Sequence, residues 1–428
     1  MTVRRIGRNG QFWLVAVWFV LLFVADFKFE GRSVLASAAG IASPRVVVEF
    51  ATYCLAGLTA FVYLTRTGWH RSRSAGLDLF LAYGLLAVAS AMWSRIPLFS
   101  AVRGVQVVAL GLVAKATASI WIEGSRDLYR DWRTIWTWFV GFISVLGVYG
   151  FVAPNTWDGR FAWQGMHPVG VGGILGVAVI AATFLLMQSA NRSQSTRVFL
   201  LGAWIWCWWL LLLTVTRSAL AATGVSIIAL IGVYSYRGNS RRRALAMFLS
   251  TSAVGLLWWF APMITAYVLR GQSTEEFSTL TGRVQLWDYG MSLFSKAPVT
   301  GYGFGSGRVL LTEAFPWGGT GHNLWVEIAL GLGIPGMVLV TALIVWVLRL
   351  SFIILRIRPS VVSVGGFGVG LLIAVKSLGA ETFAVPGSEM TMVALITAAV
   401  TAERIILSKT TSASTARQRV HAGRDSAC

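Results

Sequence analysis

Charged residues are scarce in this sequence. They make up 12% of its 428 residues, whereas an ordinary soluble domain carries about a quarter. The hydrophobic fraction is 56% and the mean hydropathy is +0.68. This balance excludes an ordinary soluble globular domain and predicts a protein that crosses a membrane several times.

Cysteine and metal-binding patterns are scarce as well. The chain has 3 cysteines, of which Cys54 and Cys207 fall in apolar segments and Cys428 in the C-terminal tail, so no disulfide framework is expected. There is no Asp-x-Asp motif and no cluster of histidines and cysteines of the kind that holds a metal. We therefore expect an activity without a bound metal or other cofactor.

Negative charge is in the minority: 36 lysines and arginines face 17 aspartates and glutamates, for a net charge of +19. A nucleic-acid partner would need the basic residues on one face or stripe, but here they occupy short loops between apolar segments. Basic loops of membrane proteins stay in the cytoplasm. The basic loops and the basic tail all fall on the side of the N-terminus, so we expect both termini to be cytoplasmic.

The hydropathy pattern predicts an all-α integral membrane protein of about 12 spanning helices, because about 20 apolar residues cross a bilayer as a helix. The membrane domain extends over 11–408, after a cytoplasmic N-terminus at 1–10 and before a disordered basic tail at 409–428. The predicted spans are 11–25, 45–65, 77–93, 98–121, 133–153, 167–189, 198–216, 218–236, 244–262, 335–356, 361–380 and 389–408.

One long polar segment, 263–334, falls on the outer face in this topology. A loop of this length with its own helical pattern is typical of a functional segment. Val284, Trp287, Met291 and Phe294 share one helical face. Thr281 can cap that helix. Arg283 then lies in the first turn, where a cation gains nothing from the helix dipole, so we expect it to bind a ligand.

Alternating glycines follow this helix, at 301, 303, 305 and 307. They are not a nucleotide-binding loop, because no strand precedes them and no Gly-Lys-Ser/Thr follows. We interpret them as a tight turn whose backbone approaches a ligand closely. His322 and Asn323 then open a short helix that is broken at 333–336.

Further polar residues are predicted on the same outer face: Arg160, His167 before Pro168, and Arg217 in a tight turn between two spans. The charges inside predicted helices, Glu49, Arg103 and Lys376, also fall near outer ends. Intramembrane charges are costly and usually face a cavity. The pattern predicts a polar pocket that opens outward. Two plainer alternatives stay open: Arg217 as a residue that snorkels to lipid headgroups, and His167 as the start of a helix.

Four short motifs resemble the signature region of the O-antigen ligase / O-antigen polymerase (ExoQ-like) superfamily of bacterial membrane glycosyltransferases. They are Arg283-x-x-x-Trp287, Pro298-x-x-Gly301-x-Gly303, His322-Asn323 and Gly333-x-x-Gly336. The resemblance extends from about Gly150 to the last hydrophobic segment and includes the turn at Arg217. It implies a multi-pass enzyme of the cell inner membrane that transfers a glycan with inversion and without a covalent glycosyl-enzyme.

The residues fit that chemistry. Nucleotide sugars are not available outside the cytoplasm, so an activated sugar there arrives on a lipid, usually a polyprenyl diphosphate. Arg217 and Arg283 can stabilise the diphosphate leaving group, because guanidinium groups pair with phosphate oxygens in bidentate geometry. His322 can take the proton of the acceptor hydroxyl or bind the diphosphate instead. The residues that we expect to bind substrate are Arg160, His167, Trp287, Gly301, Gly303 and Asn323.

Two alternatives come from other protein classes. A transporter or flippase for a lipid-linked or anionic solute would carry an internal repeat and charges near helix centres, and the sequence has neither. An anchored structural subunit would leave the chemistry of the long loop unexplained. The sequence does not separate a ligase from a polymerase. The expected partners are a polyprenyl-diphosphate-linked donor, a glycan or lipid-glycan acceptor and membrane lipids.

Overall fold

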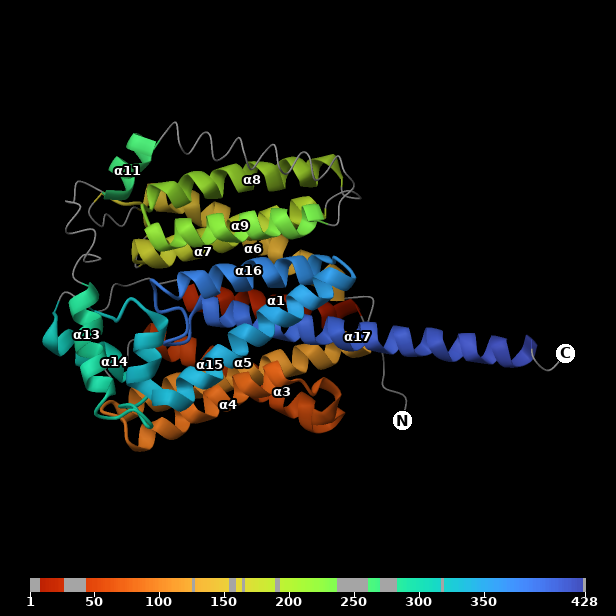
Figure 1. Cartoon of the computed structure of the whole chain (residues 1–428), viewed down its shortest axis with the longest axis horizontal. Coiled ribbons are helices and arrows are strands. Elements are labelled where there is room, and N and C mark those ends of the chain that lie inside the picture. Colours follow the sequence, from red (N-terminus) through yellow and green to blue (C-terminus); the bar gives the residue numbers. More distant parts are fainter. Residues whose placement is uncertain are drawn as a thin grey trace.

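The structure is a computed structural model that describes residues 8–26, 44–124, 128–153, 159–163, 166–188, 193–236, 261–269, 283–316 and 319–425. Within these ranges the chain is helical apart from turns and short connections, and no strand occurs. Figure 1 shows most of the helices lying lengthwise beside one another, with several short helices gathered at one end. The predicted all-α class is confirmed.

Up to residue 236, the described residues form eight α-helices and two short 3-10 helices. They are α1 (Arg8–Asp26), α3 (Pro44–Thr67), η1 (Trp69–Ser72), α4 (Ala75–Ala89), η2 (Ser90–Met92), α5 (Pro97–Glu123), α6 (Leu128–Val152), α7 (Pro168–Met187), α8 (Gln194–Leu213) and α9 (Arg217–Tyr236). The second half contributes α11 (Ala261–Leu269), α13 (Arg283–Phe294), α14 (Ser306–Ala314), α15 (Leu324–Ile357), α16 (Val361–Lys376) and α17 (Ser388–Asp425).

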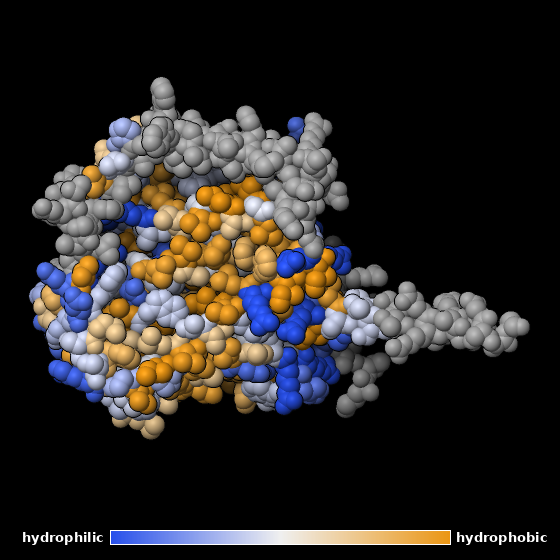
Figure 2. All heavy atoms as spheres, viewed as in Figure 1, coloured by the Kyte–Doolittle hydropathy of each residue, from blue (hydrophilic) through white to orange (hydrophobic). Residues whose placement is uncertain are grey.

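Among the described residues, 8 helices are long and apolar enough to cross a membrane, and three further apolar helices are shorter. The predicted number of spans is therefore not confirmed. The predicted span 244–262 lies outside the described residues except for its last two, which begin α11. In Figure 2 hydrophobic residues form a broad band across the middle of the bundle, and strongly hydrophilic residues gather toward its two ends, as expected for a protein in a bilayer.

Burial differs sharply between helices, which identifies the lipid-facing ones. The most apolar windows of α5, α7 and α17 are 78%, 78% and 83% buried, whereas those of α3 and α8 are only 22% and 28% buried. On α3 the side chains of Leu55 and Leu58 are 68% and 62% exposed. A helix that is hydrophobic all round belongs in a core or in lipid, so α3 and α8 face the membrane.

Small residues let the central helices approach closely. A Cβ added to Gly104 of α5 would lie 2.6 Å from the backbone nitrogen of Val88, beside α4. One added to Gly84 of α4 would lie 2.9 Å from the backbone nitrogen of Val108 in α5. Helices in membranes associate largely by such close packing, because lipid provides no hydrophobic driving force between them. The pair α4–α5 therefore forms a rigid support for the elements above it.

Helix α15 is broken near its first third. Gly333 has φ 63° and ψ −158°, which is not helical, and Pro335 follows inside the helix, where it has no N–H to donate. The break lies where the sequence predicts it. The part of α15 before Gly333 turns away from the direction of the remainder, toward α13 and α14 (Figure 1).

The C-terminal tail differs from expectation. Composition predicts disorder over 409–428, but α17 continues as a helix to Asp425 and projects from the bundle (Figure 1). A helix that is already nucleated inside the bundle extends at little cost, since each further residue adds a hydrogen bond. Alanine and arginine, which are frequent in this segment, also favour helix.

Candidate active site

The short helices α13 and α14 pack on the first part of α15 at the end of the bundle opposite the C-terminus (Figure 1). A separate small core holds them there, formed by the fully or almost fully buried side chains of Leu286, Leu311, Val326 and Leu330. The predicted helix at Arg283 is thus present. Of its predicted apolar face, Trp287 and Phe294 pack against this core, whereas Val284 and Met291 are 38% and 50% exposed. The face that packs on α15 is instead centred on Leu286.

The glycine turn lies against the break in α15. The backbone N–H of Tyr302 donates to the carbonyl of Leu330 at 2.7 Å, and that of Gly303 donates to the carbonyl of Gly331 at 2.8 Å. Gly301 has φ 60°, and a Cβ there would lie 2.6 Å from the carbonyl oxygen of Gly331. The glycines allow one backbone to approach another, so a structural role accounts for Gly301 and Gly303.

His322 is held in a strained conformation by its neighbours. Its φ is 47°, which is uncommon for any residue other than glycine and is often found at functional sites. Trp287 donates its indole N–H to the carbonyl of Gly321 at 2.8 Å. The hydroxyl of Thr320 lies 3.5 Å from Nδ1 of His322.

Asn323 secures the other side of His322. Its Oδ1 caps α15 by accepting from the backbone N–H groups of Trp325 and Val326, at 2.8 and 3.3 Å, and its Nδ2 donates to the carbonyl of Leu378 at 3.1 Å. The backbone N–H of Leu324 donates to the carbonyl of Ser377 at 3.0 Å. The connection between α16 and α17 is therefore fixed beside the histidine.

Arg217 and Arg283 lie within electrostatic range of each other, although their helices are far apart in sequence. Nη1 of Arg283 lies 3.4 Å from the carbonyl oxygen of Gly379 in the α16–α17 connection. Burial lowers the pKa of the Arg283 guanidinium below its ordinary value, the charge of Glu381 opposes this shift, and the charge of Arg217 adds to it. Two guanidinium groups near one another favour a ligand that carries more than one negative charge.

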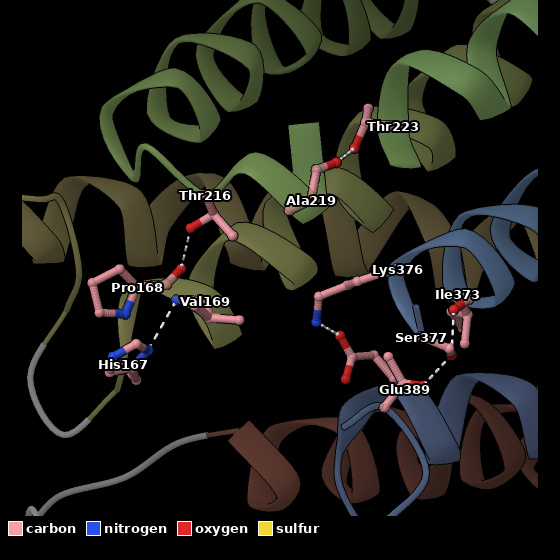
Figure 3. Close-up of polar contacts among 11 residues, drawn as sticks. His167, Pro168, Val169, Thr216, Ala219, Thr223, Ile373, Lys376, Ser377 and Glu389 are labelled. Carbon is pink, nitrogen blue, oxygen red and sulfur yellow. Dashed lines mark hydrogen bonds and ion pairs between the residues drawn. The ribbon is translucent and has the colours of Figure 1, made fainter. Parts of the chain in front are cut away.

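Arg160 and His167 lie beside the turn that carries Arg217. The backbone N–H of Phe161 donates to the carbonyl of Leu213 at 3.0 Å. The hydroxyl of Thr216 donates to the carbonyl of Pro168 at 3.1 Å, as Figure 3 shows. Nδ1 of His167 accepts from the backbone N–H of Val169 at 3.2 Å and caps α7. The helix-start interpretation thus describes what His167 does in this structure.

Three residues beyond those predicted join the site. Glu381 lies in the α16–α17 connection, with Oε1 at 3.4 Å from Nη2 of Arg308. Glu327 accepts from the backbone N–H of Gly321 at 2.5 Å. The second carboxyl oxygen of each glutamate is buried without a hydrogen-bond partner in the described structure. The sequence carries a signal for Arg308: like Arg283, it is a cation in the first turn of a helix, where it gains nothing from the helix dipole.

Glu381 carries its negative charge next to the histidine. Burial raises the pKa of the Glu381 carboxyl, but the charges of Arg308, His322 and Lys376 and a hydrogen bond from Thr320 outweigh it, so the pKa lies below its ordinary value. The carboxylate is thus ionised at neutral pH. A carboxylate in that position stabilises the protonated form of a neighbouring imidazole.

The charges predicted to face an outward pocket are ion-paired. Arg103 pairs with Glu49 between α5 and α3. Lys376, the last residue of α16, pairs with Glu389 at the start of α17, and Figure 3 shows the two side chains pointing toward each other. Gly173 of α7 lies directly against this second pair. Pairing lowers the cost of burying these charges.

No group of three or more histidine, cysteine, aspartate or glutamate side chains within the described ranges has the arrangement of a metal site. The polar chemistry found there consists of arginines, carboxylates and one histidine at one end of a helical bundle. Fold and site together describe a helical bundle with the composition of a membrane protein and a cluster of arginines and carboxylates beside a histidine.

Comparison with known protein families finds a match for part of the chain. Residues 202–341 match the family model described as O-antigen ligase, and this segment contains Arg217, Arg283, the glycine turn and His322. The match supports the O-antigen ligase family and confirms the resemblance drawn from the motifs. No curated protein matches the chain. The family indicates a glycosyltransferase-like membrane enzyme that acts on lipid-linked glycans.

Proposed function

We propose that the protein transfers a glycan from a polyprenyl-diphosphate-linked donor to an acceptor hydroxyl on the outer face of the cytoplasmic membrane, without a metal ion. The observation that carries this proposal is that Gly379 lies against both arginine segments: Nη1 of Arg283 is 3.4 Å from its carbonyl oxygen, and a Cβ added to it would lie 3.1 Å from Cβ of Ser218, the neighbour of Arg217. His322 and an ionised Glu381 lie within electrostatic range of one another. Two guanidinium groups suit a diphosphate, and a histidine backed by a carboxylate suits removal of a proton from a hydroxyl.

The reaction begins with the donor diphosphate bound by Arg217 and Arg283. The bond between the anomeric carbon and the diphosphate oxygen breaks, and its electron pair goes to the diphosphate. Guanidinium groups stabilise the charge that grows on this leaving group. Because the acceptor oxygen attacks from the opposite side of the sugar, the anomeric centre inverts.

His322 receives the proton of the acceptor hydroxyl in this scheme, and Glu381 stabilises the resulting imidazolium. Trp287 and Asn323 act as positioning residues, because they hold the backbone on either side of His322. Arg308 positions Glu381 through their ion pair. The alternative assignment of His322, as a ligand of the diphosphate, predicts a different variant phenotype.

The test separates donor binding from chemistry in purified full-length variants. Arg217→Lys and Arg283→Lys should lose donor affinity and transfer almost as severely as the alanine variants, since an ammonium cannot replace the guanidinium fork. A loss of about tenfold to a hundredfold per arginine is expected for a charge-assisted contact. His322→Ala should lower single-turnover transfer about 10²–10⁴-fold and leave donor affinity nearly unchanged.

Two outcomes would change the assignment. If His322→Ala weakens donor binding as strongly as the arginine variants do, the histidine belongs to the diphosphate site. If all three alanine variants transfer glycan at the wild-type rate, the proposed site is wrong. Arg66→Gln, an exposed arginine at the far end of α3, is the control for a general effect of lost charge.

The acceptor decides between a ligase and a polymerase. We propose an enzyme of exopolysaccharide or O-antigen assembly, and both activities use the same donor and the same leaving group. Purified protein should be offered a lipid-linked repeat unit or a finished lipid-glycan core as acceptor, with one labelled donor. Extension of the repeat unit identifies a polymerase, and labelling of the core identifies a ligase. Transfer to neither acceptor contradicts the proposal.

A further inference from the structure

A groove of about 500 Å³ lies between the second part of α15 and α17, at the end of the bundle opposite the candidate active site. Its walls are mostly apolar and include Trp346, Ile353, Ile357 and Leu407. Two arginines, Arg349 and Arg404, also line it, one from each helix. The groove thus combines an apolar channel with two positive charges.

The two arginines are available to a ligand. Both are exposed, and within the described part of the chain neither forms an ion pair or a hydrogen bond. Other arginines of this bundle, such as Arg103 and Arg308, are paired with glutamates. Arg349 belongs to a basic helix end that the charge distribution predicts to be cytoplasmic, and Arg404 lies near the same end of the last predicted span, 389–408.

We propose that this groove is a binding site for an anionic phospholipid of the inner leaflet. The phosphate lies between the guanidinium groups of Arg349 and Arg404, which can each donate two hydrogen bonds to it. One acyl chain follows the apolar wall formed by Trp346, Ile353 and Ile357. A negatively charged leaflet surface supplies such lipids at this depth. The proposal goes beyond the proposed glycan transfer and does not depend on it.

Binding of a lipid here would bridge α15 and α17. Helix α15 begins two residues after His322, and Glu389, which pairs with Lys376, is the second residue of α17. A ligand that binds the folded bundle stabilises it in proportion to its occupancy. We therefore expect anionic lipid to raise the melting temperature of the purified protein through this groove.

The experiment is native mass spectrometry of the full-length protein in detergent, titrated with phosphatidylglycerol or with phosphatidylcholine of the same chain length. Wild-type protein should bind one phosphatidylglycerol more tightly than phosphatidylcholine. Each of Arg349→Gln and Arg404→Gln should weaken phosphatidylglycerol binding about fivefold, the typical contribution of one basic residue near an anionic leaflet. Arg66→Gln, which removes the same charge from the end of α3 outside the groove, should bind as wild type does.

The apolar half of the site is tested separately. Ile353 is 41% exposed in the groove, and Val345 is 55% exposed on the same helix but does not line it. Ile353→Trp should fill the channel and weaken lipid binding while both arginines remain, whereas Val345→Trp should not. The melting temperature of each variant, measured with and without phosphatidylglycerol, shows whether it still folds and whether lipid still stabilises it.

Three results would overturn the proposal. Equal binding of phosphatidylcholine and phosphatidylglycerol would mean that the arginines do not select charge. Unchanged binding by the Arg349→Gln/Arg404→Gln double variant would place the lipid elsewhere. Inorganic phosphate that displaces the lipid completely at about 10 mM, together with an unaffected Ile353→Trp variant, would identify a free-phosphate site, because a lipid held by its acyl chain resists a competitor that has none.

Discussion

Trp287 donates its indole N–H to the carbonyl oxygen of Gly321 at 2.8 Å, and so ties helix α13 to the residue that precedes His322. The two residues are 34 positions apart in sequence. The tryptophan of the Arg-x-x-x-Trp motif thus acts on the histidine of the His322-Asn323 motif through a backbone group. This contact explains why the two motifs occur together, and it gives Trp287 a positioning role.

Trp287→Phe should lower the turnover of glycan transfer about fivefold with little change in donor affinity. The phenyl ring keeps most of the packing but cannot donate to Gly321, and a hydrogen bond of this kind is worth about 1 kcal/mol. Single-turnover kinetics and donor binding would be measured side by side. Trp209→Phe, on the exposed face of α8, is the matched control. A large loss of donor affinity in Trp287→Phe would instead indicate direct contact with substrate.

Glu381→Gln should alter the pH dependence of stability. The pKa of Glu381 lies below its ordinary value of 4.5 in the folded protein. The carboxylate therefore stabilises the fold fully above about pH 4.5, and this contribution is lost as the pH falls toward the lower folded pKa. The melting temperature of wild type should exceed that of Glu381→Gln at pH 7, and the difference should shrink at pH 4. A constant difference would show that Glu381 acts through shape alone.

Gly303→Ala should destabilise the protein by about 1–3 kcal/mol, because φ is 98° there and the new methyl group would overlap Ser94. Gly202→Ala is the control: a Cβ at this position of α8 meets nothing within 4 Å, and alanine favours helix over glycine. Thermal unfolding in detergent measures both. If Gly303→Ala keeps wild-type stability but loses donor binding, the glycine turn contacts the ligand directly.

Transfer by the purified protein should survive EDTA, since the arginines are expected to neutralise the diphosphate in place of a metal. The assay compares single-turnover rates before and after chelation, and again after magnesium or manganese is added back. Activity that is lost with EDTA and restored by either ion would point to a carboxylate site. Asp288, Glu313, Glu327 and Glu381 would then be tested first.

The predicted orientation can be checked with cysteine variants in a background without Cys54 and Cys428. Ala314→Cys on α14 and Thr410→Cys on α17 are both exposed and lie at opposite ends of the bundle. The first should react with an impermeant thiol reagent on intact cells whose outer envelope is permeabilised, and the second only after lysis. Labelling of residue 410 in intact cells would reverse the orientation and remove the argument for a lipid-linked donor.

The helices and turns of the candidate site were easier to predict from the sequence than the contacts between them. Glycine, proline and a capping asparagine act locally, so the break at Gly333 and the helix start at Asn323 were predictable from a few adjacent residues. Long apolar runs identified most of the long helices for the same reason. The buried face of α13 was only partly predictable by periodicity, because the helix packs on α14 and α15 through Leu286 and leaves Val284 and Met291 exposed.

Contacts between distant segments were beyond the sequence. The connection between α16 and α17 brings Glu381 within electrostatic range of His322. No motif in the sequence of this connection predicts that contact. Lys376 forms an ion pair with Glu389 of a different helix. The sequence does not show this partner, and a charge inside a predicted span without a known partner indicates a cavity. The sequence predicts that Gly301 and Gly303 approach a ligand closely. In the structure the backbone of this turn approaches the backbone of α15 instead, and a contact with so distant a segment cannot be predicted from the glycines alone.

The break in α15 also limits how far His322, the proposed base, can lie from the rest of that helix. A straight helix rises 1.5 Å per residue, so an unbroken α15 would carry Asn323 about 15 Å beyond Gly333 along the axis of the span. Any bend at Gly333 shortens that reach. A donor anchored by its lipid tail has its diphosphate at the membrane surface, and the bend keeps the proposed base near that height. The glycine turn donates hydrogen bonds to Leu330 and Gly331, just before the break. In the proposed function it therefore helps to fix the height of His322 relative to the membrane surface.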